Sequence, residues 1–104
     1  MIRKPNEKRS DELYRAILLL KDEGECERFF RDLCTVAELR AMEQRFEVAL
    51  LLSDGMIYKD ILSRTGASSA TISRVNRSLQ DGADGYNTLL PRVREQMKKA
   101  EENR

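Results

Sequence analysis

The sequence predicts an all-α protein, and three observations carry the prediction. Apolar residues between Ser10 and Lys99 recur at spacings of three and four, as on one face of a helix, and do not alternate as in a strand. The run Thr35-Val36-Ala37-Glu38 matches a capping box, in which the threonine oxygen and the glutamate carboxylate satisfy free backbone N–H groups. Gly66 separates two short segments with apolar faces, as a turn between helices requires.

The first two helices are placed by their ends. Ser10 is a good N-cap with two acids in the following turn, and Gly24 is expected to end the helix that Ser10 begins. This helix is expected to bury Leu13, Ile17 and Leu20, with Tyr14 and Leu18 beside them. A second helix is expected over residues 25–33, with an apolar side formed by Phe29, Phe30 and Leu33.

The capping box at Thr35 opens a longer third helix. It is expected to stop at Asp54-Gly55, because glycine favours the left-handed turn that ends many helices. Its apolar stripe comprises Leu39, Met42, Phe46, Ala49 and Leu50. The last helix of the chain is expected to begin near residues 89–91, because Pro91 is tolerated best in the first turn of a helix.

The segment between these helices predicts a helix-turn-helix over residues 58–79. A short helix over residues 56–65 is followed by Gly66 in a left-handed turn and by Ser68 as the cap of the next helix. At about 100° per residue, one stripe of that second helix is apolar and expected to be buried; it comprises Ile72, Val75 and Leu79. The opposite stripe comprises Ala70, Ser73, Arg74 and Arg77. A helix presented in this way can enter the major groove of DNA.

Composition restricts the classes of function. A chain of 104 residues, 40% of them apolar, holds about one domain, which we place over residues 10–99 between a flexible basic arm (1–9) and a short tail (100–104). Two cysteines without histidine fit no zinc site, and neither a nucleophile–base pair nor a phosphate-binding glycine loop can be assembled. The sequence therefore predicts no metal, no cofactor and no enzyme activity. The lack of a long apolar run or a signal peptide predicts a cytoplasmic protein that binds no membrane.

Charge is distributed unevenly, although the formal net charge is only +1. Residues 10–56 hold six basic and eleven acidic residues, whereas residues 57–80 hold four basic residues and one acid. The basic segment coincides with the predicted helix-turn-helix, where positive charge would attract phosphates. Pattern and charge together favour double-stranded DNA as the partner.

The run Thr35 to Arg45, then Gly66-Ala67-Ser68-Ser69-Ala70-Thr71-Ile72-Ser73-Arg74 and the pair Ser78-Leu79, resembles the tryptophan repressor superfamily. Within it, the chain is similar to the short Trp repressor-like proteins of the YerC/YecD type. The resemblance covers about residues 10–99 and implies six helices that intertwine with those of a second copy. It also implies a homodimer that represses transcription from a palindromic operator, with two helix-turn-helix units in successive major grooves.

The resemblance assigns DNA contacts to the turn, to the second helix and to the helix before the turn. With the outward stripe described above, the expected DNA-binding set is Lys59, Ser68, Ser69, Ala70, Thr71, Ser73, Arg74 and Arg77. Leu62 stands where tryptophan-responsive members have a lysine, so a different operator sequence is expected.

The resemblance also implies a corepressor site. In tryptophan-responsive members the ligand lies between two arginines and near a threonine, and the matching residues here are Thr35, Arg45 and Arg74. However, Val75 replaces the glycine of those members, and its branched side chain would crowd the indole. Asp32 and Cys34 also stand in place of leucines. The sequence thus disfavours tryptophan and leaves another small-molecule corepressor open.

Other interpretations stay open from the residues alone. The helix pair could belong to a dimeric interaction module whose basic face docks an acidic protein partner without binding DNA. Arg45 and Arg74 could clamp an anionic metabolite other than tryptophan. The three expected ligand residues also have purely structural explanations: Thr35 can serve as an N-cap, and Arg45 and Arg74 can be solvated surface residues.

Overall fold

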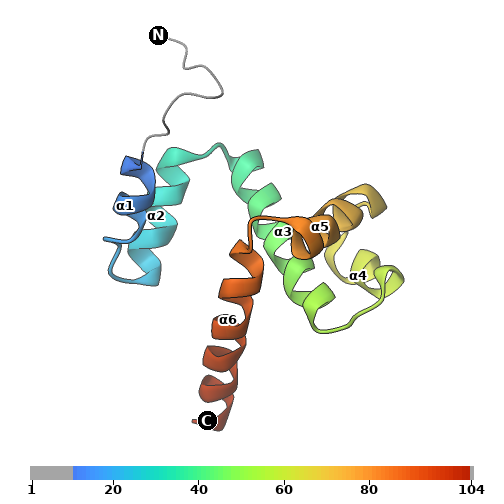
Figure 1. Ribbon diagram of the computed structural model, residues 1–104. Coiled ribbons are helices and arrows are strands. Elements are labelled where there is room, and N and C mark those ends of the chain that lie inside the picture. Colours follow the sequence, from blue (N-terminus) through green and yellow to red (C-terminus); the bar gives the residue numbers. More distant parts are fainter. Residues whose placement is uncertain (1–10, 104) are drawn as a thin grey trace. The chain divides into compact units, whose positions relative to one another are not determined.

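A computed structural model describes residues 11–103 (Figure 1). These residues form six helices and no strand, which confirms the predicted all-α class. The helices are α1 (Glu12–Ile17), α2 (Glu23–Leu33), α3 (Val36–Ser53), α4 (Tyr58–Thr65), α5 (Ser69–Asp81) and α6 (Gly85–Glu102). The chain divides into two compact units at the boundary between Leu39 and Arg40, within α3. The predicted basic arm and the predicted cap at Ser10 lie outside the described residues.

The first unit contains α1, α2 and the first turn of α3. Its first helix ends at Ile17, and a new helix begins after Asp22, whose carboxylate accepts a hydrogen bond from the Glu25 N–H at 2.8 Å. The Glu25 carboxylate in turn accepts a hydrogen bond from the Lys21 N–H at 3.0 Å. The prediction that Gly24 ends the first helix is therefore wrong, because this reciprocal capping starts α2 one residue before it.

The predicted end of the second helix at Leu33 and the predicted capping box at Thr35 are confirmed. The second expected helix, over residues 25–33, is α2 with two more residues at its start. At the capping box, the Thr35 N–H donates to Glu38 Oε1 at 2.8 Å and the Glu38 N–H donates to Thr35 Oγ1 at 3.1 Å. The backbone hydrogen bond from Thr35, followed by the side-chain one, lowers the pKa of Glu38 below its ordinary 4.5, because both favour the charged carboxylate.

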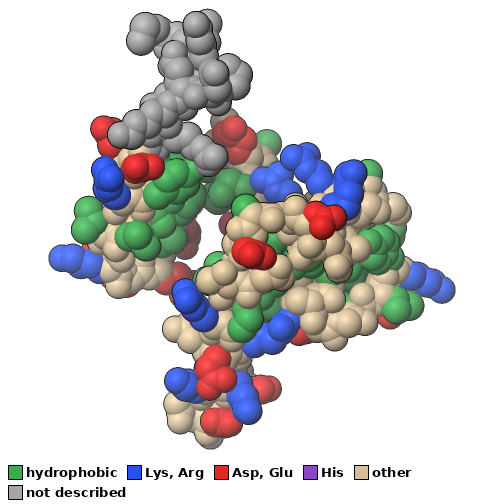
Figure 2. Space-filling model, viewed as in Figure 1, with side chains coloured by type: hydrophobic (Ala, Val, Ile, Leu, Met, Phe, Trp, Pro, Cys, Tyr) green, Lys and Arg blue, Asp and Glu red, His purple; other side chains and the backbone are tan. Residues whose placement is uncertain are grey.

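The apolar residues of the first unit stay largely uncovered. None of the described residues before Arg40 is buried, and Leu18, Leu19 and Val36 are 84%, 76% and 70% exposed. Figure 2 shows apolar side chains at the surface of α1 and α2. The predicted burial of the first helix is therefore wrong for the single chain: Leu13 is exposed and Ile17 only half-buried, because two short helices provide no further layer to cover them.

The second unit contains the core. The buried side chains come from α3, α4, the turn before α5, α5 and α6, and comprise Val48, Ala49, Leu51, Ile61, Ala67, Ile72, Val75 and Leu90. Phe46 and Leu50, on the predicted stripe of α3, pack against this cluster, whereas Met42 is exposed. The helix ends at Ser53 and Gly55 follows with a φ of 87°, as predicted.

The last helix begins earlier than predicted. α6 starts at Gly85, so Pro91 lies inside it and not in its first turn. Leu90 packs into the core and fixes this part of α6, and proline at position 91 removes only one backbone donor from an exposed position. Upstream, the Asn87 amide donates to the Leu79 carbonyl at 3.0 Å and to Asp84 Oδ1 at 3.3 Å, which ties the start of α6 to the end of α5.

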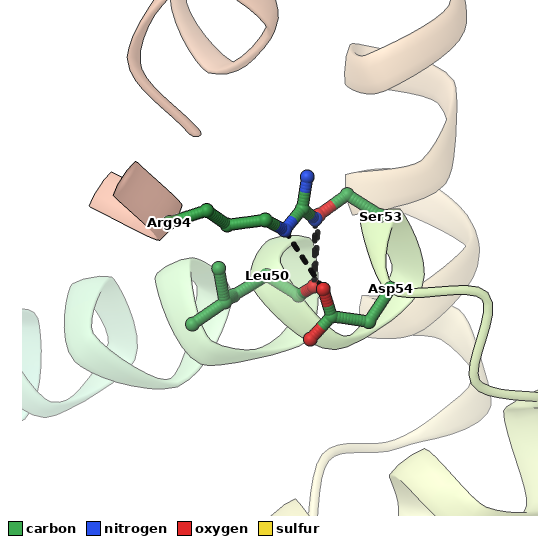
Figure 3. Close-up of polar contacts among 4 residues, drawn as sticks. All are labelled: Leu50, Ser53, Asp54 and Arg94. Atoms are coloured by element: carbon green, nitrogen blue, oxygen red, sulfur yellow. Dashed lines mark hydrogen bonds and ion pairs between the residues drawn. The ribbon is translucent and has the colours of Figure 1, made fainter. Parts of the chain in front are cut away.

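A cluster around Arg94 joins α6 to the end of α3 (Figure 3). Arg94 Nε donates to Asp54 Oδ1 at 2.8 Å, and Nη2 donates to the Leu50 carbonyl at 3.5 Å and to the Ser53 hydroxyl. A cation at a helix C-terminus also meets the negative end of the helix dipole. The arginine therefore holds α6 against the last turn of α3.

Candidate nucleic-acid interface

Three residues, 66–68, join α4 to α5. Gly66 has a φ of 73°, and its N–H donates to the Leu62 carbonyl at 2.9 Å, which closes α4 with the predicted left-handed cap. The Thr65 hydroxyl donates to the Ile61 carbonyl at 2.8 Å and accepts from the Ala67 N–H at 3.1 Å. Ala67 is also buried, so both hydrogen bonds and packing fix the backbone conformation of the turn.

The turn is also attached to α3. The Gln44 side chain donates from Nε2 to the Thr65 carbonyl at 3.3 Å, across 21 residues of sequence. This contact supplements the buried Ile61 and Ile72, which pack against the α3 residues of the core. Sequence analysis missed Gln44, since no local pattern connects it with the turn.

Ser68 caps α5 as predicted. Its Oγ accepts from the Thr71 N–H at 3.1 Å and its hydroxyl donates to Thr71 Oγ1 at 3.0 Å. Both hydroxyls therefore hold the helix start. The N–H groups of Ser69 and Ala70 have no partner among residues 11–103, so the positive end of the helix dipole carries two free donors.

The two faces of α5 differ as predicted. Ile72 and Val75 are 0% and 1% exposed, and Leu79 is half-buried against the core. The opposite stripe is exposed along its length: Ala70, Ser73, Arg74 and Arg77. Neither guanidinium has a hydrogen bond or ion pair with any other described residue. Figure 2 shows basic side chains beside the segment that α5 occupies in Figure 1.

The structure brings the expected DNA-binding set onto one continuous segment. Its eight members lie on α4, the turn and α5, and all are exposed except Thr71, which is half-buried. The expected corepressor residues are distributed differently. Thr35 belongs to the first unit and is engaged in the capping box, whereas Arg45 and Arg74 belong to the second, half-buried on α3 and exposed on α5 respectively.

An open apolar hollow of about 400 Å³ lies between α3, the end of α5 and the start of α6. Its lining includes Phe46, Ser78, Tyr86 and Leu89, and neither Arg45 nor Arg74. The hollow is therefore not the anion clamp considered from the sequence. It could not be foreseen, because its walls come from segments more than thirty residues apart.

A well-supported glycine turn, a capped second helix and an exposed basic stripe on that helix define a helix-turn-helix protein. The family model of the Trp repressor protein matches residues 8–94. The chain belongs to the Trp repressor family, a family of regulators and not of enzymes, as the sequence predicted.

Relatives and solved structures support the membership. The chain is 52% identical over 88 residues to the uncharacterized protein YerC of Bacillus subtilis (strain 168), covering 85% of each chain. A crystal structure of a candidate Trp repressor from Staphylococcus aureus matches with a TM-score of 0.78 and 50% identity, over 81% of this chain and 84% of that one. A TrpR-like protein from Eubacterium eligens ATCC 27750 matches with a TM-score of 0.77 and 52% identity, over 80% and 86%. The predicted resemblance and six-helix fold are thus confirmed.

Proposed function

We propose that this protein is a sequence-specific DNA-binding regulator that represses transcription as a homodimer on a palindromic operator. The observation that carries the proposal is the pair of opposite faces on α5. Buried Ile72 and Val75 seat the helix, while small and hydroxyl side chains at its start can approach base edges closely. Arg74 and Arg77 follow on the exposed stripe, where they can reach phosphates or guanine.

Two further features supply phosphate contacts in this proposal. The free N–H groups of Ser69 and Ala70 are donors at a helix N-terminus, a place that favours anions. Lys59 is exposed on α4, the helix that would cross the DNA backbone. Such contacts fix the position of the helix on the duplex, and the side chains of Ser69 and Ala70 would then select the sequence.

The uncovered first unit supports the homodimer. Leu18, Leu19 and Val36 are large apolar residues left in water by the single chain, and a second copy would remove that surface. The dimer would have a mass of about 24 kDa, twice the 12.0 kDa of the chain. Its two-fold axis would set half-site centres about 34–36 Å apart, or a multiple of that distance. Sedimentation at micromolar concentration measures the mass directly.

A small-molecule corepressor bound by Arg45 and Arg74, which both belong to the second unit, is a separate part of the proposal. Arg45 is half-buried and has no ion pair or hydrogen bond among the described residues, so its charge is free for an anionic ligand. Tryptophan is disfavoured because Val75, which stands where tryptophan-responsive relatives have glycine, is a branched side chain and is buried. Thermal-shift screening of amino acids and related carboxylates tests this part, and Arg45→Ala should abolish any shift found.

Selection of duplexes from a random pool tests the main proposal. We expect an enriched palindrome at moderate salt. Arg77→Ala or Lys59→Ala should weaken binding to all duplexes. Each should also reduce the slope of log affinity against log salt concentration by about one, the value for one lost phosphate contact. Changes at Ser69 or Ala70 should instead alter the preferred sequence. Arg92→Ala, which removes an exposed arginine from α6, is the matched control.

A pool without an enriched palindrome would contradict sequence-specific recognition. A protein that binds no duplex even at low salt would instead favour the dimeric interaction module, whose basic face docks an acidic protein. The cytoplasmic location predicted from the sequence is consistent with a regulator that binds DNA.

A further inference from the structure

The exposed stripe of α5 ends in an acid. At about 100° per residue, positions 70, 74, 77 and 81 fall within an arc of about 60°, so they form one row along the helix. Three of these positions are Ala70, Arg74 and Arg77 of the proposed DNA surface, and the fourth is Asp81, the last residue of α5. A surface that only attracted DNA would have a basic or neutral residue there.

Nothing in the described structure uses the Asp81 carboxylate. The side chain is exposed and has no hydrogen bond or ion pair with any of residues 11–103, although Arg77 lies one turn earlier. An aspartate at a helix C-terminus also faces the negative end of the helix dipole, which is unfavourable. The chain thus keeps an acid where neither pairing nor helix stability favours it.

Geometry places this acid at the flank of a bound groove. From Ala70 to Asp81, α5 rises about 16 Å at about 1.5 Å per residue, whereas the major groove is about 12 Å wide. With the start of the helix at the base edges, the far end therefore reaches the sugar-phosphate backbone. Screening confines its effect to about 10 Å at 0.1 M salt, so the carboxylate acts on nearby phosphates and not on the bases.

We propose that Asp81 is a specificity-determining residue, which repels phosphates at the C-terminal end of the recognition helix. Asp81 weakens binding in which the whole length of α5 lies along the sugar-phosphate backbone of DNA. Binding in which the N-terminal end of α5 enters the groove is then favoured. This inference rests on the proposed DNA binding. Its consequence is a lower affinity for random sequence and a larger ratio of specific to random affinity.

Fluorescence anisotropy with a labelled random duplex tests the inference with three variants. Asp81→Asn removes the charge, Asp81→Glu keeps it, and Asp32→Asn makes the same change of charge at an exposed residue of α2. One unit charge about 7 Å from a phosphate in water changes affinity about threefold, so a dimer with two such helices should change about tenfold. We expect Asp81→Asn to bind random duplex more tightly, with a gain that approaches tenfold at low salt and shrinks towards 0.3 M salt.

The controls separate the charge at position 81 from the shape of the side chain and from the net charge of the protein. Asp81→Glu and Asp32→Asn should bind random duplex as the unmodified protein does, and the affinity of Asp81→Asn for the selected operator should rise less than its affinity for random duplex. Equal affinities for Asp81→Asn and the unmodified protein, or a gain that does not depend on salt, would overturn the inference alone. An unmodified protein that binds no duplex overturns the proposed function, and this inference with it.

Discussion

Substitution of Ser68 separates the structural role of the α5 cap from the proposed role of this helix start in binding DNA. The Ser68 hydroxyl accepts from the Thr71 N–H at 3.1 Å, and the neighbouring N–H groups of Ser69 and Ala70 are free for a phosphate. Alanine at position 68 removes the acceptor, and loss of such a cap costs about 1 kcal/mol. In a domain of this size, that loss lowers the thermal midpoint by about 4–8 °C.

Aspartate and asparagine at position 68 should differ in their effect on the affinity for DNA. Both are as good as serine at capping, so Ser68→Asp and Ser68→Asn should keep the thermal midpoint of the unmodified protein. Aspartate, however, would place a charge about 5 Å from a phosphate bound at the helix start, which weakens binding about fourfold per helix and about fifteenfold for a dimer. Asparagine adds no charge and should therefore weaken binding much less than aspartate does.

Circular dichroism at 222 nm measures the midpoints, and anisotropy of a labelled duplex at 0.1 M salt measures the affinities. A midpoint of Ser68→Ala equal to that of the unmodified protein would show that the cap does not support α5. Duplex affinity of Ser68→Asp equal to that of Ser68→Asn would refute a phosphate at this helix start. The reasoning thus fails in two distinguishable ways.

Three further predictions concern the fold. Ile72→Ala, which empties a fully buried site in the core, should lower the free energy of unfolding by about 2–5 kcal/mol in chemical denaturation, while Ile72→Val should lower it by about 1 kcal/mol. The lowered pKa of Glu38 means that its contribution to stability is present above its ordinary 4.5 and is lost as pH falls through the folded value. Thermal midpoints from pH 7 to pH 3 should therefore fall more steeply for the unmodified protein than for Glu38→Gln, and equal slopes would contradict the capping box as the cause. Arg94→Ala, which removes the contact with Asp54, should destabilise the protein by about 1 kcal/mol, and Arg94→Lys should restore only part of that loss because lysine lacks the forked donors.

Features encoded within a few residues could be predicted from the sequence. The hydrogen bonds between Thr35 and Glu38, the left-handed Gly66 and the cap at Ser68 each depend on residues at most four apart. The buried and exposed faces of α5 follow from helical periodicity, with Ile72 fully buried as expected. Local chemistry therefore specified the helix-turn-helix.

Two misplaced helix ends show where local rules compete. Asp22 and Glu25 have the same spacing as Thr35 and Glu38, so the sequence encodes the start of α2, although Gly24 by itself predicts a helix end. The reciprocal hydrogen bonds of Asp22 and Glu25 stabilise a helix start that includes Gly24. Pro91 likewise predicts a helix start near residues 89–91, whereas α6 begins at Gly85. Burial of the neighbouring Leu90 outweighs the one backbone hydrogen bond that proline cannot make.

Contacts between distant segments could not be predicted. Gln44 reaches Thr65 across 21 residues, and Arg94 reaches Asp54 across 40. Neither residue type nor local spacing distinguishes these side chains from other exposed polar residues. They become recognisable only when the core has brought α3, the turn and α6 together.

The two compact units differ in what stabilises them, and the difference connects the fold with the proposed function. The second unit seats α5 with its own core, so each recognition helix has its shape within one chain. The first unit has no buried residue among those described, so its exposed leucines contribute little to stability until something covers them. If a second copy covers them, association orders the first unit and leaves the recognition helix unchanged. Dimerisation would then set the distance between two preformed recognition helices, and this distance has to match the distance between the half-sites of a palindromic operator.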